Sequence, residues 1–223
     1  MFRKIMASTT EENYLKALFN LSNSTGEVGI SDLAQSLQVS LPTANSMVKS
    51  LQKGGWVIYE KYKPVVLTLE GKKAAALVIR KHRLTEMFLV KKMGFGWEEV
   101  HEVAEQIEHI HAPKFFERMD EILGYPTVDP HGSPIPDAQG RMQEFSYQPL
   151  SACKVGQEVQ LTALTNSSAE FLEFLNGRAL KLGLQLKIHS REAYDQSMVI
   201  SYENHPSETL SEKVCERLLV RVL

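Results

Sequence analysis

The 223-residue sequence predicts a mainly α-helical protein with small β parts. Apolar residues recur at helical spacing through most of the first 124 residues. Five of the nine prolines then fall within residues 125–150, which is typical of a loop or linker. After residue 153 the pattern changes to short β-rich runs. We therefore expect an N-terminal winged helix-turn-helix, a helical middle domain and a small C-terminal β-barrel.

Composition limits the class of protein. The hydrophobic content of 43% and charged content of 23% are ordinary for a globular chain. No apolar run approaches the roughly 18 residues that span a bilayer, and MFRKIMASTT contains no signal peptide. We therefore expect a cytosolic protein with no membrane partner. Cys153 and Cys215 have no CxxC spacing, so neither a disulfide framework nor a thiolate zinc site is indicated.

The charge is unevenly distributed along the chain. The net charge of −2 is the sum of +3 in residues 1–75, −2 in residues 76–124 and −3 in residues 125–223. The basic N-terminal part is compatible with contacts to phosphates.

The first 53 residues predict three helices. The first runs from Glu11 to Leu21, with Thr9 and Glu12 spaced as a capping box. The second carries the apolar stripe Ile30–Leu37, with Ser31 as its cap. The third runs from Pro42 to Lys53, and its polar face contains short polar groups and lysines but no acid. This pair of short helices is the outline of a helix-turn-helix.

Two β-rich runs follow the third helix directly. WVIYEKY and PVVLTL are separated by a turn that contains Lys63 and Pro64, and they predict a basic hairpin. A basic hairpin at this place is the wing of a winged helix, which would contact phosphates. An ordinary hairpin on a small helical domain is the alternative.

Two further predicted helices, Glu70–Met93 and Trp97–His111, carry histidines and carboxylates at helical spacing. His82 and Glu86 are four residues apart. A second single face is formed at i, i+4, i+7 and i+8 by His101, Glu105, Glu108 and His109. Facing stripes of this kind build divalent-metal sites inside helical bundles. Solvated pairs on the helix surface are the alternative for either stripe alone.

The remaining elements are an apolar helix and the β-rich tail. The helix PKFFERMDEIL, residues 113–123, buries its apolar face either in a dimer or in the core of the same chain. Strands are expected at Val159–Ala163, Leu184–Ile188, Met198–Tyr202 and Leu218–Leu223, with a short helix at Ser168–Asn176. Short strands around one helix predict a β-barrel of about 70 residues.

With these elements in this order, the chain resembles the metal-dependent repressors of the diphtheria-toxin-repressor and manganese-transport-regulator family. The resemblance covers almost the whole chain and is most specific in TTEENYLKALF, SLPTANSMVKSLQKGG, KHRLTEMFL and VHEVAEQIEHI. The loop GSPIP also resembles the family's loop after the ligand helices. The tail resembles the Src-homology-3-like (FeoA-like) domain of the iron-responsive branch. The implied domains are residues 1–73 (DNA-binding), 74–145 (metal-binding and dimerisation, ending in the linker) and 151–223 (Src-homology-3-like).

The resemblance implies two metal sites. The ancillary site is made by His82, Glu86 and His101, and the primary site includes Glu108 and His109. Glu105 falls where iron-type members have Cys and manganese-type members have Glu. Asn13 falls where iron-type members have Met and manganese-type members have Asp. Glu12, beside Asn13, could replace it as a ligand. Lys16 stands where manganese-type members have a further Glu, so their two-metal arrangement is not simply transferable. Glu170 falls near a residue that completes the ancillary site of iron-type members.

The implied function is repression of metal-uptake genes by a metal-loaded homodimer on a palindromic operator, with two sites per subunit for Mn²⁺ or Fe²⁺. Ligation by nitrogen and oxygen alone suits either ion. Glu105 points to manganese and the tail to iron, and we favour manganese. We expect no enzymatic activity and no small-molecule substrate. The alternatives are a hydrolase with a two-metal centre, although HExxH is absent, and a metal-independent winged-helix regulator.

The DNA contacts are expected on the third helix and the wing. We expect the base edges to be contacted by Thr43, Asn45 and Ser46. We expect the phosphates to be contacted by Ser40, Lys49, Lys61 and Lys63, and Pro42 also lies among the DNA-contacting residues.

Overall fold

The computed structural model describes residues 7–22, 26–143, 145–165 and 167–223. The chain forms two compact units that do not follow the order of the sequence. Unit 1 comprises residues 1–85, 104–124 and 135–143, and unit 2 comprises residues 86–103, 125–134 and 144–223. Among the described residues, no helix has both the length and the apolar character needed to cross a bilayer. Residues 1–6, part of the stretch in which no signal peptide is expected, lie outside the described ranges.

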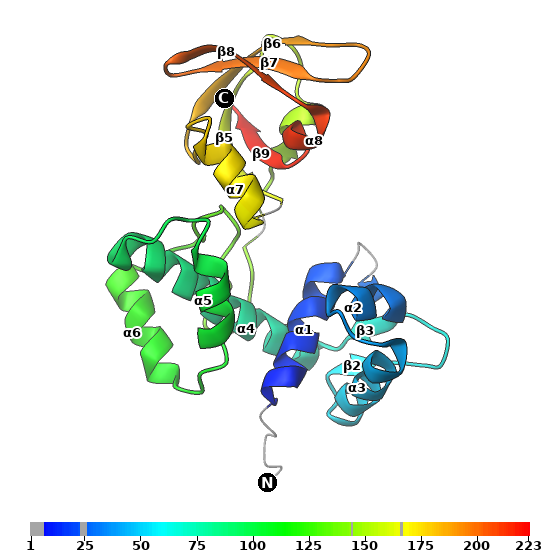
Figure 1. The fold of residues 1–223 in the computed structure, drawn as a ribbon. Coiled ribbons are helices and arrows are strands. Elements are labelled where there is room, and N and C mark those ends of the chain that lie inside the picture. The colour runs from blue at the N-terminus through cyan, green and yellow to red at the C-terminus, as the bar shows by residue number, and fades with distance from the viewer. Residues whose placement is uncertain (1–6, 23–25, 144, 166) are drawn as a thin grey trace. The chain divides into compact units, whose positions relative to one another are not determined.

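The N-terminal part of unit 1 is a winged helix-turn-helix (Figure 1). Its helices are α1 (Thr9–Leu21), α2 (Ile30–Ser36) and α3 (Leu41–Lys53). Its strands are β1 (Glu27–Val28), β2 (Val57–Ile58) and β3 (Val65–Leu67), paired antiparallel in the order β1-β3-β2. Apolar side chains of all three helices and of this sheet share one core.

The first helix begins earlier than predicted. Ser8 is the N-cap of α1, because its Oγ accepts a hydrogen bond from the Glu11 backbone N–H at 3.3 Å. The Glu11 carboxylate accepts in return from the Ser8 N–H at 2.9 Å. The capping box predicted from Thr9 and Glu12 is therefore wrong by one residue. The shift matters for function, since Glu12 is buried rather than used as a cap.

Similar shifts occur at the next two helices. Gly29 is the N-cap of α2, so the cap predicted at Ser31 is wrong. Ser40 is the N-cap of α3, and its Oγ accepts from the Thr43 N–H at 3.3 Å. The predicted start of this helix at Pro42 is one residue late.

The middle of the chain is helical, and its elements are α4 (Leu69–Phe88), the π-helix η1 (Leu89–Met93), α5 (Val100–Ile107) and α6 (Pro113–Leu123). The helix predicted to Met93 therefore changes from α to π geometry after Phe88. The helix predicted from Trp97 to His111 is shorter at both ends, with turns on either side of α5. In unit 1, Arg80 of α4 holds α6 through Asp120 at 2.5 Å, and it donates to the Pro136 carbonyl at 2.7 Å.

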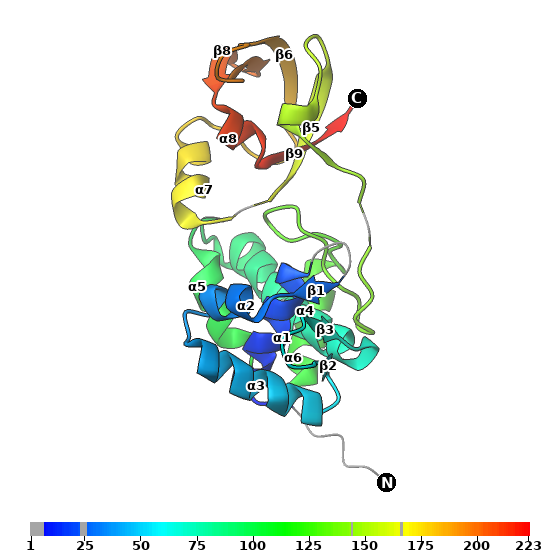
Figure 2. The same ribbon diagram turned by 90° about the vertical axis from the view of Figure 1, so that its right-hand side faces the viewer.

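The C-terminal part of unit 2 is an antiparallel sheet in the order β4-β9-β5-β6-β7-β8. Figure 2 shows β5, β6, β8 and β9 of this sheet. The strands are β4 (Gln148–Pro149), β5 (Glu158–Leu164), β6 (Gln185–Arg191), β7 (Met198–Tyr202), β8 (His205–Leu210) and β9 (Leu218–Val222). A 3-10 turn and two helices complete it, namely η2 (Leu150–Ala152), α7 (Ala169–Asn176) and α8 (Glu212–Cys215). Within the described residues, β4 and β8 are the end strands of this order and do not pair with each other. Neither β4, β8 nor α8 was predicted.

Candidate functional site

A first cluster of ligand-type side chains lies in unit 1, between α4 and the end of α5. His82, Glu105 and Glu108 each place one ligand atom within 4.8 Å of the others. His82 Nδ1 lies 2.6 Å from Glu108 Oε2, and the Glu108 side chain is fully buried. Glu105 and Glu108 are three residues apart, so the helical repeat turns both carboxylates toward α4.

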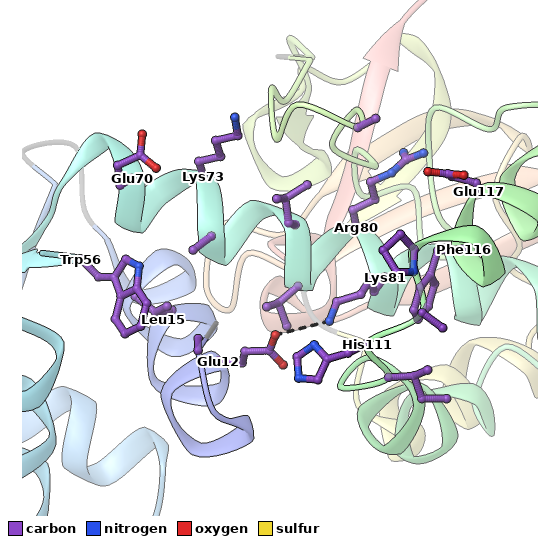
Figure 3. Close-up of a pocket in the computed structure, with 18 residues that line it drawn as sticks. Glu12, Leu15, Trp56, Glu70, Lys73, Arg80, Lys81, His111, Phe116 and Glu117 are labelled. Carbon is purple, nitrogen blue, oxygen red and sulfur yellow. Dashed lines mark ion pairs between the residues drawn. The ribbon is translucent and has the colours of Figure 1, made fainter. Parts of the chain in front are cut away.

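Helix α1 adds a carboxylate to this cluster. Glu12 Oε2 lies 2.6 Å from His109 Nδ1, and His109 Nε2 lies 3.5 Å from Glu108 Oε1. The other Glu12 oxygen is 3.5 Å from Lys81 Nζ. Figure 3 shows Glu12 reaching from α1 toward Lys81, beside His111, at the wall of a cavity of about 440 Å³. The alternative ligand Glu12 is therefore the α1 group that contacts an imidazole of the cluster.

Lys16 of α1 neutralises the carboxylates from the other side. Its Nζ lies 2.5 Å from Glu105 Oε1 and 2.8 and 3.0 Å from the two oxygens of Glu108. Burial raises the pKa of Glu108, but the hydrogen bond from His82 and the charge of Lys16 outweigh it and hold that pKa below its ordinary value. Glu108 is therefore an anion at neutral pH.

The donor atoms of this cluster fit a divalent cation. Carboxylate oxygens and imidazole nitrogens without thiolate suit Mn²⁺ and Fe²⁺. The Asn13 Oδ1 atom is buried and, within the described residues, accepts no hydrogen bond. Buried acceptors normally find a donor, so an orphaned amide oxygen on the turn between Glu12 and Lys16 is consistent with a ligand position.

A second cluster lies within unit 2. Glu86, Asp129 and His131 are all buried and bring ligand atoms within 4.8 Å of one another. His101 Nδ1 lies 3.5 Å from Glu86 Oε1. His131 Nε2 lies 2.9 Å from the Trp97 carbonyl, which can only accept, so Nε2 donates and Nδ1 is the acceptor of the neutral imidazole. That Nδ1 lies 3.9 Å from Glu86 Oε2, and a carbonyl-bound imidazole of this kind is the usual arrangement of a metal-ligating histidine.

The loop that carries Asp129 and His131 is held by its own hydrogen bonds. Asp129 Oδ1 accepts from the His131 and Ser133 N–H groups at 2.8 and 2.9 Å. The His131 carbonyl accepts from Leu164 of β5 at 3.0 Å, and the Trp97 ring stacks on the imidazole. Sequence reasoning missed both ligand-type residues. The available signal was the tripeptide DPH before the GSPIP loop, but nothing in it says that the loop folds back onto Glu86.

The remaining predicted ligands lie in both units. His82, which the resemblance assigns to the ancillary site, hydrogen-bonds to Glu108 in unit 1. Glu86 and His101 lie in unit 2. Glu170 is exposed in the first turn of α7 and belongs to none of the described clusters.

The predicted DNA-contacting residues lie on the surface of α3 and the wing. The exposed members are Ser40, Pro42, Thr43, Ser46, Lys49, Lys61 and Lys63. Asn45 is half-buried, and its Oδ1 accepts a hydrogen bond from Tyr59 Oη at 2.9 Å. In the wing, Glu60 pairs with Lys63 at 2.6 Å, and this hydrogen bond and charge raise the pKa of Lys63. Cationic and short polar side chains are therefore accessible on α3 and the wing, as contact with phosphates requires.

Comparison with known proteins agrees with this geometry. Residues 6–65 match the family model for the N-terminal DNA-binding domain of iron-dependent repressors, and residues 68–137 match the model for their metal-binding and dimerisation domain. The iron-dependent repressor IdeR of Mycobacterium tuberculosis is 35% identical over 163 residues, which are 71% of this chain and 67% of that protein. The transcriptional regulator MntR of Bacillus subtilis is 32% identical over 120 residues, 54% of this chain and 84% of that protein.

Solved structures extend the similarity to the tail. A manganese-dependent transcriptional repressor in complex with manganese has a TM-score of 0.85 and 29% identity, and the match covers 96% of this chain and all (100%) of that one. IdeR of T. acidophilum has a TM-score of 0.76 and 26% identity over 97% of this chain and all (100%) of that one.

The chain is thus a DNA-binding protein of the transcriptional-repressor class. It belongs to the iron-dependent repressor family. The resemblance seen in the sequence is confirmed, and so is the winged helix-turn-helix followed by a helical domain and a sheet domain. Because members of this family are regulators, the hydrolase alternative is set aside.

Proposed function

We propose that this chain represses metal-uptake genes by binding a palindromic operator as a homodimer when its two clusters hold Mn²⁺ or Fe²⁺. The observation that carries the proposal is the position of the unit 1 cluster. Glu12 and Lys16 come from α1, whose apolar side is part of the winged-helix core. Glu105, Glu108 and His109 come from α5 and the turn that follows it. The cluster therefore ties the DNA-binding domain to the metal-binding helices.

The primary cation would be held by Glu105, Glu108 and His109, with Asn13 or Glu12 as the ligand from α1. A bound divalent cation supplies positive charge that offsets the buried carboxylates. Fixing α1 against α5 favours one placement of α3, which is the DNA-competent state. The cation stabilises this state over the DNA-incompetent state only by the difference between its affinities for the two states.

The second cation would be held in unit 2 by Glu86, Asp129 and His131, with His101 close by. Three of these groups are buried and prearranged by the Trp97 carbonyl and the Asp129 loop, so little rearrangement is needed. Glu170 is retained as a proposed further ligand of this site.

Manganese is favoured as the physiological ion. Both clusters offer only nitrogen and oxygen, and a carboxylate at Glu105 in place of a soft thiolate suits Mn²⁺. One of the compared structures is a manganese-dependent repressor by name, whereas the mycobacterial relative is named for iron.

Helix α6 supports the homodimer. It buries Phe116 and Met119 but leaves Phe115 45% and Ile122 48% exposed. One face of the helix packs internally, and the other presents large apolar side chains that the proposed dimer would cover. A two-fold dimer repeats the α3 helix and would bind a palindromic site.

The test is DNA binding by the full-length chain, measured by fluorescence anisotropy on a duplex selected from a random library in the presence of Mn²⁺. We expect binding with Mn²⁺ or with Fe²⁺ under anaerobic conditions, and its loss after chelation. Glu108→Gln and Glu86→Gln separate the two clusters, and Lys49→Ala reports on the phosphate contacts. Lys49→Ala should lower affinity for all duplexes and reduce its salt dependence.

Two results would contradict the proposal. Equal DNA binding with and without chelator would show a metal-independent winged-helix regulator. Absence of selected DNA under either ion would remove the operator from the proposal altogether.

A further inference from the structure

Lys16 occupies the position that a cation in the unit 1 cluster would need. Its Nζ makes three contacts of 2.5 to 3.0 Å, all with oxygens of Glu105 and Glu108. The Lys16 side chain is only 14% exposed, and that of Glu108 is 0% exposed. The ammonium is therefore a desolvated charge held between two carboxylates, and its partners are the groups proposed to bind the metal.

An ammonium and a divalent cation cannot share these oxygens. An ammonium has three N–H donors, and here all three have a carboxylate oxygen in range. A cation bound to Glu105 Oε1 and Glu108 Oε1 would stand within a few ångströms of the Lys16 charge, where like charges repel strongly in a buried setting. Loading of the cluster therefore requires Lys16 to leave its present position.

The same contacts give Lys16 a structural effect without metal. Lys16 lies on α1, while Glu105 and Glu108 lie on α5 and directly after it. Because the ammonium joins them, the two helices are already connected by a charged bridge before any cation arrives. Removal of this bridge would take a positive charge away from two neighbouring carboxylates, of which Glu108 also contacts His82 and His109.

We propose that Lys16 competes with the activating cation for the carboxylates of the unit 1 cluster. Without the cation, Lys16 holds α1 to α5, and its presence raises the metal concentration at which the cluster loads. This inference rests on the proposed function only in taking Glu105 and Glu108 as ligands. Lys16 is in this sense a determinant of metal affinity and not itself a ligand.

The proposal is tested by direct Mn²⁺ titration of the full-length chain without DNA, in competition with a chromophoric chelator. The variants are Lys16→Met, which keeps the length of the side chain, and Lys16→Gln, which keeps a polar end. Both are measured in a Glu86→Gln background, so that the unit 2 cluster does not contribute. Lys181→Met is the matched control, because it removes one exposed lysine from the sheet domain.

We expect both Lys16 variants to bind Mn²⁺ about tenfold or more tightly than the parent, the scale of one charge-assisted hydrogen bond. Urea unfolding in chelator provides the second measurement. The Lys16 variants should be less stable than the parent without metal and should gain more stability from Mn²⁺.

The outcomes separate this inference from the proposed function. Unchanged or weaker Mn²⁺ binding in folded Lys16→Met and Lys16→Gln, with Glu108→Gln still abolishing it, overturns the role of Lys16 alone. A titration that Glu108→Gln does not alter overturns the cation site itself and both proposals with it. Tightening by Lys181→Met as well would reduce the effect to net charge and would also overturn the inference.

Discussion

Gly71 is the position where a single methyl group should uncouple the wing from the metal-binding helices. It lies in the first turn of α4 and packs against the end of the α3–β2 connection. A Cβ at this position would lie 1.9 Å from the Trp56 carbonyl oxygen and 3.1 Å from Leu67 Cδ2. The first contact is with backbone and far inside van der Waals distance, so the substitution Gly71→Ala must displace either α4 or the backbone at Trp56.

The size of the effect follows from three terms. Overpacking of a close contact costs about 1 to 3 kcal/mol. The Trp56 carbonyl also accepts hydrogen bonds from the Thr68 N–H at 3.0 Å and Thr68 Oγ1 at 3.1 Å, and weakening them costs about 1 to 2 kcal/mol. Alanine in place of glycine gains about 1 kcal/mol of helix propensity. The net loss expected for Gly71→Ala is about 1 to 4 kcal/mol.

Urea unfolding of the chelated protein measures this loss, and Gly177→Ala is the control. A Cβ at Gly177 would meet only two carbonyl oxygens at 3.6 and 3.7 Å, and the residue has φ −60. Its stability should change by less than about 1 kcal/mol. If Gly71→Ala unfolds at the same urea concentration as the parent, the close approach of α4 to Trp56 is wrong. If it is destabilised and yet keeps full Mn²⁺-dependent DNA binding, the contact does not couple the two functions.

Three further predictions use single groups. The pKa of Glu108 is lower in the folded chain than its ordinary value of 4.5, so the ionised carboxylate stabilises the fold at pH values above 4.5. The free energy of unfolding in chelator should fall as the pH drops through the lowered pKa. Glu108→Gln should flatten this decline in urea titrations across the acidic range. Tyr59→Phe removes the donor to Asn45 Oδ1, which should cost about 1 kcal/mol and alter base preference at one position of the selected half-site; identical selected sequences would exclude Asn45 from base contact. Cys215 is fully buried, and burial raises its pKa to about 11. Its thiol should therefore resist thiol reagents at neutral pH until urea unfolds the chain. Fast labelling of Cys215 in the native protein would contradict this packing.

The helical part of the fold was predictable because periodicity records which face is buried. Pro113–Leu123 is predicted to the residue, since a first-turn proline and a glycine after the last turn mark both ends. The capping residues were harder, because Ser8, Thr9 and Thr10 offer equivalent hydroxyls in consecutive positions. In the structure Glu11, three residues after Ser8, completes the capping box. In the sequence Glu12 stands three residues after Thr9 and is an equally good partner, so the spacing alone does not choose between the two.

The site was predictable where its ligands follow a helical repeat. Glu105 and Glu108 could be paired from their spacing alone, and the structure brings them together. Asp129 and His131 could not be placed, because a loop has no periodicity and its direction depends on tertiary contacts such as that of His131 with the Trp97 carbonyl. The role of Lys16 was hidden for a related reason, since a lysine on a helix is ordinarily solvated and only the packing of α1 against α5 shows that it is not.

Helix α1 is the element in which DNA binding and metal binding meet, and its length makes the coupling direct. Within 13 residues it buries Leu15 and Leu18 in the core that also holds α3, and it places Glu12 and Lys16 against His109 and the carboxylates of the metal cluster. A helix of this length transmits displacement as a rigid body, because its backbone hydrogen bonds fix both stripes to each other. Exchange of the Lys16 charge for a divalent cation therefore acts on the same helix that supports α3. A difference of about 1 to 3 kcal/mol between the two states at this junction is enough to change DNA affinity about 5- to 150-fold.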